Sequence, residues 1–323
     1  EYLNKFFIML TRRHIRVKVM QGLYALTQTK EESLDKQKKF LHFSMEKMSS
    51  LYLLLLSLFI ELQAHASSQL ELASKKYLAS AADTSPQKAK FSNNLVLLQI
   101  KDNPAILEVI AKRKLNTWYL NEEYVKIIFR EILASEAYET YLSTPEGNYK
   151  EDLDFIIKIF REIIAPNEKM YDFLEDDTLT WADDMPIVNT YLLKQLKRLT
   201  PKQTGTAFLN GLEIHEDDEE FAQELLSKTA LKDSLLSKEI EGKTPKWDKD
   251  RIADVDAVLL KMAICELLHF PSIPVRVTIN EYLEIAKEYS TPKSSIFING
   301  ILDNLSKEYK DAGKLLKVGR GLL

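Results

Sequence analysis

Residues 11–27 read TRRHIRVKVMQGLYALT, and this stretch sets the pattern that the rest of the chain follows. Ile15, Val19, Leu23 and Leu26 recur at i, i+4, i+8 and i+11, which places them on one apolar face of a helix from about Met9 to Thr27. The 323 residues contain only 9 glycines and 10 prolines. Few helix breakers among many helix formers predict an all-α protein built from helical bundles.

The start of this helix is crowded with positive charge. Arg12, Arg13, Arg16 and Lys18 lie there in a chain whose formal net charge is −4. Charge that is concentrated against the overall balance most often serves to bind phosphate. Tyr24 lies eleven residues after Arg13, nearly in line with it along the helix.

Arginines beside an aromatic ring suit RNA, because guanidinium groups hold phosphates while the ring stacks on an unpaired base. The pattern leaves a second interpretation open, namely a solvated basic face with the tyrosine half-buried in the core.

A second candidate site lies at the start of a helix predicted over residues 292–309. Thr291 is expected to cap this helix and Pro292 to be its first residue. Lys293, Ser294 and Phe297 then lie in its first turns, where free amides can bind a phosphate and a ring can stack on a base. A phenylalanine at the edge of the core explains the same pattern, and taken alone the pattern favours it.

The chain lacks the common catalytic and metal-binding motifs. It contains no glycine-rich phosphate loop, no nucleophile elbow and no paired cysteines, and its five histidines are dispersed. The single Cys265 is expected to be a small packed residue. We therefore expect no enzymatic activity, no metal site and no cofactor.

The most apolar run, Leu51–Ile60, spans ten residues. As a helix it rises only ~15 Å, half of a ~30 Å hydrocarbon layer, so we interpret it as a core helix and expect no membrane association. The N-terminus lacks the features of a secretory signal, and residues 1–8 are expected to lie upstream of a natural start at Met9. A cytoplasmic location follows as the expectation.

Several motifs resemble the NusB family of transcription antitermination factors. They are RRHIR at 12–16, QGLY at 21–24, AICEL at 263–267, PVRVTINE at 274–281, LEIAK at 283–287 and FINGILD at 297–303. Their order and spacing match those of the family, and they cover roughly a third of the chain.

The resemblance implies two small helical bundles without enzymatic activity. It also implies binding to the boxA element of ribosomal RNA leaders, together with the ribosomal protein NusE and the transcription elongation complex. Arg12, Arg13 and Arg16 would be the main RNA contacts, joined by Tyr24 and Phe297. The resemblance places a contact to the protein partner at Asp256, which the apolar stripe of its helix leaves facing outward.

The chain departs from the family at three points. His14 and Ile15 thin the usual arginine run, so that His14 adds charge only when protonated. Lys293 occupies a position that is often acidic. About 185 residues, from Gln28 to His215, replace a much shorter connector.

We therefore expect a NusB-like RNA-binding core formed by residues 9–28 and 216–310, a helical insertion over 29–215 and a flexible basic tail over 311–323. Two alternatives remain: a non-catalytic scaffold for protein interactions, and an RNA-binding accessory module for ribosomal RNA processing or modification.

Overall fold

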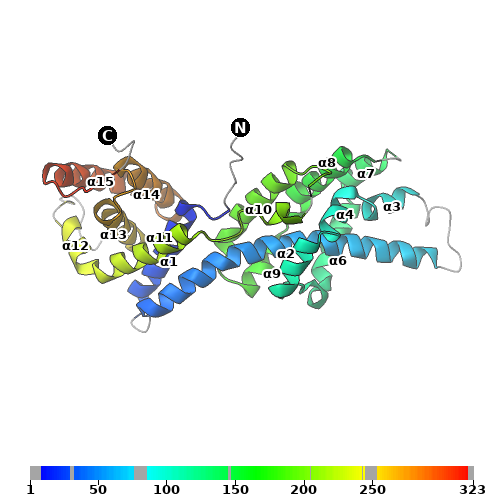
Figure 1. Ribbon diagram of the computed structural model, residues 1–323, viewed down its shortest axis with the longest axis horizontal. Helices are drawn as coiled ribbons and strands as arrows, with labels where there is room; N and C mark the ends of the chain where they lie inside the picture. Colours follow the sequence, from blue (N-terminus) through cyan, green and yellow to red (C-terminus); the bar gives the residue numbers. More distant parts are fainter. Residues whose placement is uncertain are drawn as a thin grey trace. The chain divides into compact units, whose positions relative to one another are not determined.

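The computed structural model describes residues 9–29, 33–75, 86–144, 147–203, 205–241, 243 and 253–318, with backbone alone for 86–88. Within these ranges the regular structure is helical throughout, with short 3₁₀ and π segments and no strand (Figure 1). The predicted all-α fold is confirmed. Residues 1–8, which were expected to precede the natural start, lie outside the described residues.

The chain divides into two compact units. Unit 1 comprises Glu1–Met9 and Glu46–Glu213, and unit 2 comprises Leu10–Met45 and Ile214–Leu323. Helix α2 (Leu34–Ser74) belongs to both, since its first turns lie in unit 2 and the remainder in unit 1.

Unit 1 is organised around the apolar part of α2. Leu51, Leu53 and Leu56 are fully buried there, which confirms that this run belongs to the core. Polar groups beside this apolar run are hydrogen-bonded. The indole Nε1 of Trp118 donates to the Leu54 carbonyl oxygen and to Ser57 Oγ, and Tyr52 Oη donates to the Phe208 carbonyl oxygen.

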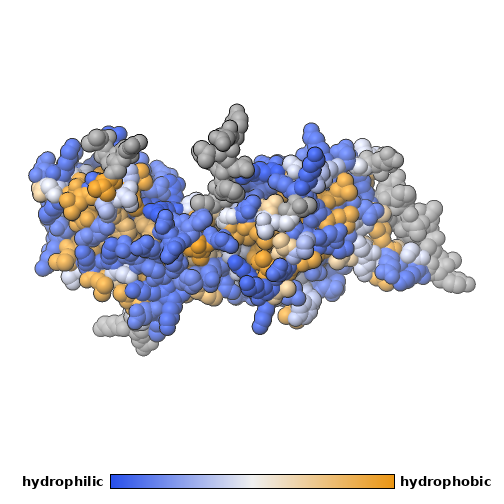
Figure 2. All heavy atoms as spheres, viewed as in Figure 1, coloured by the Kyte–Doolittle hydropathy of each residue, from blue (hydrophilic) through white to orange (hydrophobic). Residues whose placement is uncertain are grey.

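The length argument that excluded a membrane span does not hold for α2 as a whole. This helix has 41 residues and is long and apolar enough to cross a bilayer, although 72% of its most apolar window is buried inside the protein. Hydrophilic residues cover most of the face in view in Figure 2.

Short helices complete unit 1. They are α3 (Pro86–Ser92), α4 (Leu95–Lys101), α5 (Pro104–Lys112), η1 (Trp118–Leu120), α6 (Glu122–Leu133), α7 (Glu136–Leu142), α8 (Tyr149–Ile159), η2 (Phe160–Ile164), α9 (Glu168–Asp177), α10 (Trp181–Lys197) and η3 (Gly205–Leu209). Many begin at an asparagine or serine whose side chain accepts a hydrogen bond from the first-turn backbone, as Asn94, Asn103, Asn148 and Asn167 do.

These caps explain where the sequence-based boundaries were wrong. The sequence pattern alone predicts one helix over about 121–142, but in the structure Ser135 caps a new helix, α7, by accepting a hydrogen bond from the Tyr138 amide. The pattern also predicts a separate helix over about 67–82, whereas in the structure α2 continues without a break up to Ser74. The seven-residue α3 and α4 were missed, because two turns are too short to show a period.

Unit 2 surrounds one central helix. Helix α13 (Asp254–His269) packs against α1 (Arg12–Gln28), α11 (Glu216–Leu231), α12 (Asp233–Ile240), α14 (Val275–Tyr289) and α15 (Ser294–Asp311) (Figure 1). Ten of its residues are buried, among them Met262, Ile264 and Cys265. Cys265 is therefore the packed residue that the sequence predicted.

A charged residue on α13 is also buried. Glu266 is 0% exposed and accepts two hydrogen bonds from Arg16 of α1, Nη2 to Oε1 at 2.7 Å and Nε to Oε2 at 2.8 Å. Thr278 Oγ1 and Tyr282 Oη, both on α14, donate to the same carboxylate at 2.8 and 3.1 Å. Burial disfavours the charge of Arg16, yet its bonds to Glu266 raise the arginine pKa overall, so the guanidinium is charged.

This ion pair ties α1 and α14 to the central helix. The Phe221 and Tyr282 rings lie 5.1 and 5.8 Å from the guanidinium carbon of Arg16. Hydrogen bonds and aromatic faces together replace the water that the two charges lose on folding.

The segment after Asp311 does not fray as expected over its described part. Lys317 Nζ donates to the carbonyl oxygens of Glu266 and Phe270 at 3.2 and 2.9 Å, and the Val318 amide donates to the Pro271 carbonyl oxygen at 3.1 Å. A cation at the C-terminal end of α13 satisfies carbonyls that the helix leaves open. Residues 319–323 of the predicted tail lie outside the described residues.

We expect Arg16→Met to cost about 3–5 kcal/mol of stability, because it leaves the Glu266 carboxylate buried without its partner. Urea unfolding followed by circular dichroism measures this cost. Arg12→Met is the matched control, since Arg12 is 41% exposed and its ion pair contributes about 1 kcal/mol or less. Equal costs for the two variants would contradict a structural role for Arg16.

We expect Lys317→Ala to release residues 312–318 from α13 and to accelerate hydrogen exchange at the Val318 amide. Lys314→Ala is the control, because Lys314 is 54% exposed and lies 3.8 Å from Glu239. Unchanged exchange in the Lys317 variant would show that its hydrogen bonds do not hold the segment.

Candidate nucleic-acid interface

The basic start of α1 offers two arginines to solvent. Arg12 and Arg13 each keep 41% of their side-chain surface exposed. Thr11 precedes the helix, and its amide donates to His14 Nδ1 at 3.3 Å, so the histidine ring takes part in capping the helix.

Carboxylates from other helices orient both arginines. Arg13 donates from Nε and Nη2 to Glu281 at 2.8 and 2.9 Å, and this hydrogen-bonded pair lowers the pKa of Glu281. Arg12 donates from Nε to Asp218 at 3.1 Å, and its guanidinium carbon lies 4.8 Å from the centre of the Phe221 ring. The Nη1 group of Arg13 and both terminal nitrogens of Arg12 are outside these bonds, so the arginines retain donors for a phosphate.

A shallow cavity of about 570 Å³ lies beside these arginines. Its lining also includes Pro274, Val277 and Glu281, and Val277 is 43% exposed. The site therefore combines oriented guanidinium groups with an apolar wall.

Arg16 and Lys18 do not belong to this exposed surface. Arg16 is 2% exposed and its guanidinium is bonded to Glu266, while Lys18 is 5% exposed. The prediction that both side chains contact RNA is therefore corrected: one turn beyond Arg12 the helix faces the core, and neither side chain reaches the surface.

Tyr24 lies at the far end of α1 and is 37% exposed. Eleven residues of helix separate it from Arg13, a rise of about 16 Å. Beyond it, Gln28 Nε2 donates to Asp254 Oδ2 in the first turn of α13 at 3.0 Å. The ring and the arginines consequently belong to opposite ends of the helix.

The second candidate site begins later than predicted. Helix α15 starts at Ser294, with Lys293 as its N-cap, after a turn closed by the Ser294 amide and the Thr291 carbonyl oxygen. Lys293 is exposed and Phe297 is half-buried, whereas Ser294 is buried. The predicted ligand role of Ser294 is corrected, since its hydroxyl bonds Asp256 Oδ2 at 2.7 Å.

Asp256 does not face outward as the sequence indicated. It is 5% exposed and accepts hydrogen bonds from the hydroxyls of Ser290 and Ser294 at 2.6 and 2.7 Å. Its carboxylate therefore fixes the turn between α14 and α15. Because Asp254 and Asp256 share the first turn of α13, that turn connects the end of α1 with the start of α15.

The sequence analysis did not identify the acids that hold the arginines as their partners. Glu266 lies in the otherwise apolar run Met262–Leu268, and an acid at such a position signals a buried cation. Asp218 and Glu281 lie 206 and 268 residues from their arginines, and no sequence signal pairs them. Among the described residues, no group of three or more His, Cys, Asp or Glu side chains is placed to hold a metal ion.

The model of the NusB family matches residues 188–307, which run from α10 to α15 and leave out α1. The Transcription antitermination protein NusB of Salinibacter ruber is 41% identical over 104 residues, 32% of this chain and 65% of the relative. The protein of the same name from Thermodesulfovibrio yellowstonii is 42% identical over 99 residues, 31% of this chain and 66% of the relative.

A further relative of that name, from Chloroherpeton thalassium, is 51% identical over 77 residues, 24% of this chain and 36% of the relative. The chain thus spans slightly less than two thirds of the Salinibacter ruber and Thermodesulfovibrio yellowstonii relatives and about one third of the Chloroherpeton thalassium relative. A solved structure, T. maritima NusB, is 31% identical and covers 37% of this chain and 75% of its own, with a TM-score of 0.28. Through its C-terminal helices this chain belongs to the NusB family, and it carries a further helical region that the family match does not include.

Proposed function

We propose that this chain is a non-catalytic transcription antitermination factor that acts in the cytoplasm. It binds boxA-type leader RNA of ribosomal RNA operons together with NusE and the transcription elongation complex. The similarity to three proteins named Transcription antitermination protein NusB supports the general role. The observation that carries the RNA assignment is the pair of half-exposed, carboxylate-oriented arginines, Arg12 and Arg13.

These arginines suit a phosphate backbone for a physical reason. An unrestrained arginine loses side-chain entropy when it binds, whereas Glu281 and Asp218 already restrict the two guanidinium groups. The donors left over can still bond to phosphate oxygens. The carboxylates also reduce the local positive charge, which disfavours weak binding to any polyanion and so favours a selective ligand.

Base recognition is proposed for the aromatic groups. Tyr24 at one end of α1 and Phe297 beside the exposed Lys293 offer rings to unpaired bases, as single-stranded RNA requires. The RNA surface that we propose therefore consists of Arg12, Arg13, Tyr24, Lys293 and Phe297. NusE remains the proposed protein partner, without a direct contact from the buried Asp256.

We expect Arg12→Gln combined with Arg13→Gln to weaken boxA RNA binding at least about tenfold. The two lost phosphate contacts should also reduce the slope of log K against log salt by about 1.4 on single-stranded RNA. Fluorescence anisotropy with a labelled boxA oligonucleotide at several salt concentrations measures both effects. Circular dichroism should be unchanged, because neither arginine is buried.

Arg161→Gln is the matched control, since Arg161 is 56% exposed in unit 1 and pairs with the neighbouring Glu162. An unchanged affinity and salt slope in the double variant would contradict the assignment to α1. Equal affinity of the unmodified chain for boxA RNA and for a scrambled RNA of the same length would favour the scaffold hypothesis instead.

A further inference from the structure

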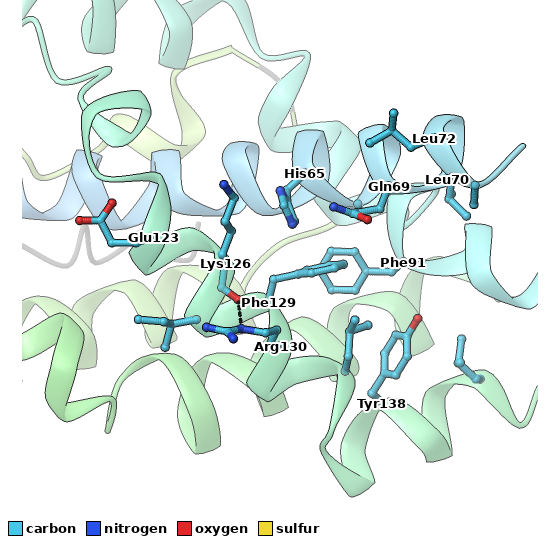
Figure 3. Close-up of a pocket in the computed structure, with 15 residues that line it drawn as sticks. His65, Gln69, Leu70, Leu72, Phe91, Glu123, Lys126, Phe129, Arg130 and Tyr138 are labelled. Carbon is cyan, nitrogen blue, oxygen red and sulfur yellow. Dashed lines mark hydrogen bonds between the residues drawn. The ribbon is translucent and has the colours of Figure 1, made fainter. Parts of the chain in front are cut away.

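Cavities lined by arginines occur in both units, and they differ in how their charges are arranged. In unit 1 an apolar groove of about 830 Å³ lies between the C-terminal half of α2 and helices α3, α6 and α7 (Figure 3). Its lining carries the exposed carboxylate of Glu123 as well as the guanidinium of Arg130, so its charges select neither an acidic nor a basic ligand. In unit 2 the charges of the cavity beside Arg12 and Arg13 are joined to each other.

The wall of the unit 2 cavity contains a planar pair of charged groups. Arg13 donates from Nε to Glu281 Oε2 at 2.8 Å and from Nη2 to Glu281 Oε1 at 2.9 Å, and both residues line the cavity. Two parallel hydrogen bonds of this kind hold the guanidinium and the carboxylate in a common plane. The same bonds raise the pKa of Arg13 and lower the pKa of Glu281, so both groups are charged near neutral pH and the pair as a whole is neutral.

Apolar side chains adjoin this planar pair. Val277 lies four residues before Glu281 on α14, a spacing that places two side chains next to each other, and Val277 is 43% exposed. Pro274 and the buried Ile273 complete the apolar part of the lining. The cavity volume of about 570 Å³ falls in the range of small-molecule sites. The cavity therefore offers a flat and neutral surface beside an apolar wall.

These features suit a flat, uncharged ring better than a phosphate. Unpaired RNA bases are bound by stacking on aromatic rings or on the plane of an arginine guanidinium. A phosphate in the same place would meet the carboxylate of Glu281 as well as the guanidinium. Arg12, by contrast, uses only its Nε in the bond to Asp218, so its terminal nitrogens remain for a phosphate. Neighbouring residues of α1 thus offer separate contacts to a base and to the backbone of one strand.

We propose that this cavity holds one unpaired base of a bound single-stranded RNA, stacked on the plane of Arg13 and Glu281 and packed against Val277. The inference rests on the RNA-binding role proposed for α1 and adds a base contact to it. Glu281 is a positioning residue in this site, because it holds the Arg13 guanidinium flat. Arg13 Nη1, which is outside the bonds to Glu281, lies at the edge of the plane and can still donate to a phosphate.

Glu281→Gln tests the positioning role by the sign of its effect. The substitution removes a negative charge beside the RNA, which by charge alone strengthens binding. It also breaks the bidentate pair, so we expect the affinity for a labelled boxA oligonucleotide to fall about fivefold in fluorescence anisotropy, with unchanged circular dichroism. Glu284→Gln is the matched control, since Glu284 lies one turn further along α14, is 45% exposed and pairs with Lys287. It removes the same charge and should not weaken binding.

A set of boxA oligonucleotides, each with one base removed to leave an abasic nucleotide, tests for the base itself. We expect the removal of one particular base to cost the unmodified chain about tenfold in affinity through lost stacking. The same removal should cost only about twofold in Glu281→Gln and about fourfold in Val277→Ala, because these variants have already lost part of the surface under that base. Bases that contact Tyr24 or Phe297 should keep their full cost in both variants.

Leu235→Ala is the matched control for Val277→Ala, since Leu235 is 62% exposed in the same unit and does not line the cavity. It should leave the cost of every abasic position unchanged. If Glu281→Gln strengthens binding, or if no abasic position is coupled to Glu281 and Val277, the base site is wrong while a boxA-binding role for the chain stands. A chain that binds no RNA would contradict both the base site and the proposed function.

Discussion

The buried ion pair between Arg16 and Glu266 is the interaction on which the arrangement of unit 2 depends. It joins α1 to α13, and the hydroxyls of Thr278 and Tyr282 extend it to α14. Two charges inside a core are costly unless every donor and acceptor is satisfied. Because this geometry is met by only one rotation of α1 about its axis, the ion pair also determines which side of α1 faces solvent.

The orientation of α1 separates arginines that look alike in the sequence. Arg16 faces the core, while Arg12 and Arg13, within one turn of it, remain half-exposed and rest on acids of α11 and α14. The structural role and the proposed RNA-binding role therefore fall on different members of one cluster. Charge reversal of all three residues would mix the two roles, since it would disrupt the core as well as the proposed interface.

The sequence predicted the all-α fold, the burial of the Leu51–Ile60 run and the packed Cys265, because composition and period report directly on helices and their apolar faces. It could not predict that Arg16 is buried, since its partner Glu266 lies 250 residues away. Periodicity also misjudged Asp256, because an apolar stripe identifies the core face but not a carboxylate that two serine hydroxyls draw inward. Hydrophobic periodicity, which is averaged over a window of residues, likewise could not locate a helix end that a single capping residue sets, such as the start of α7 at Ser135.

The most direct test of this division of roles is the boxA RNA affinity of the double variant Arg16→Gln with Glu266→Gln. Two amides can bond to each other, and the amide at position 266 can accept from one of the Thr278 and Tyr282 hydroxyls through its oxygen and donate to the other through its nitrogen, so the unit should remain folded by circular dichroism. Our account predicts an affinity within about twofold of the unmodified chain, because Arg16 does not reach the surface. A folded double variant whose RNA affinity falls about tenfold would contradict it and would return Arg16 to the RNA interface.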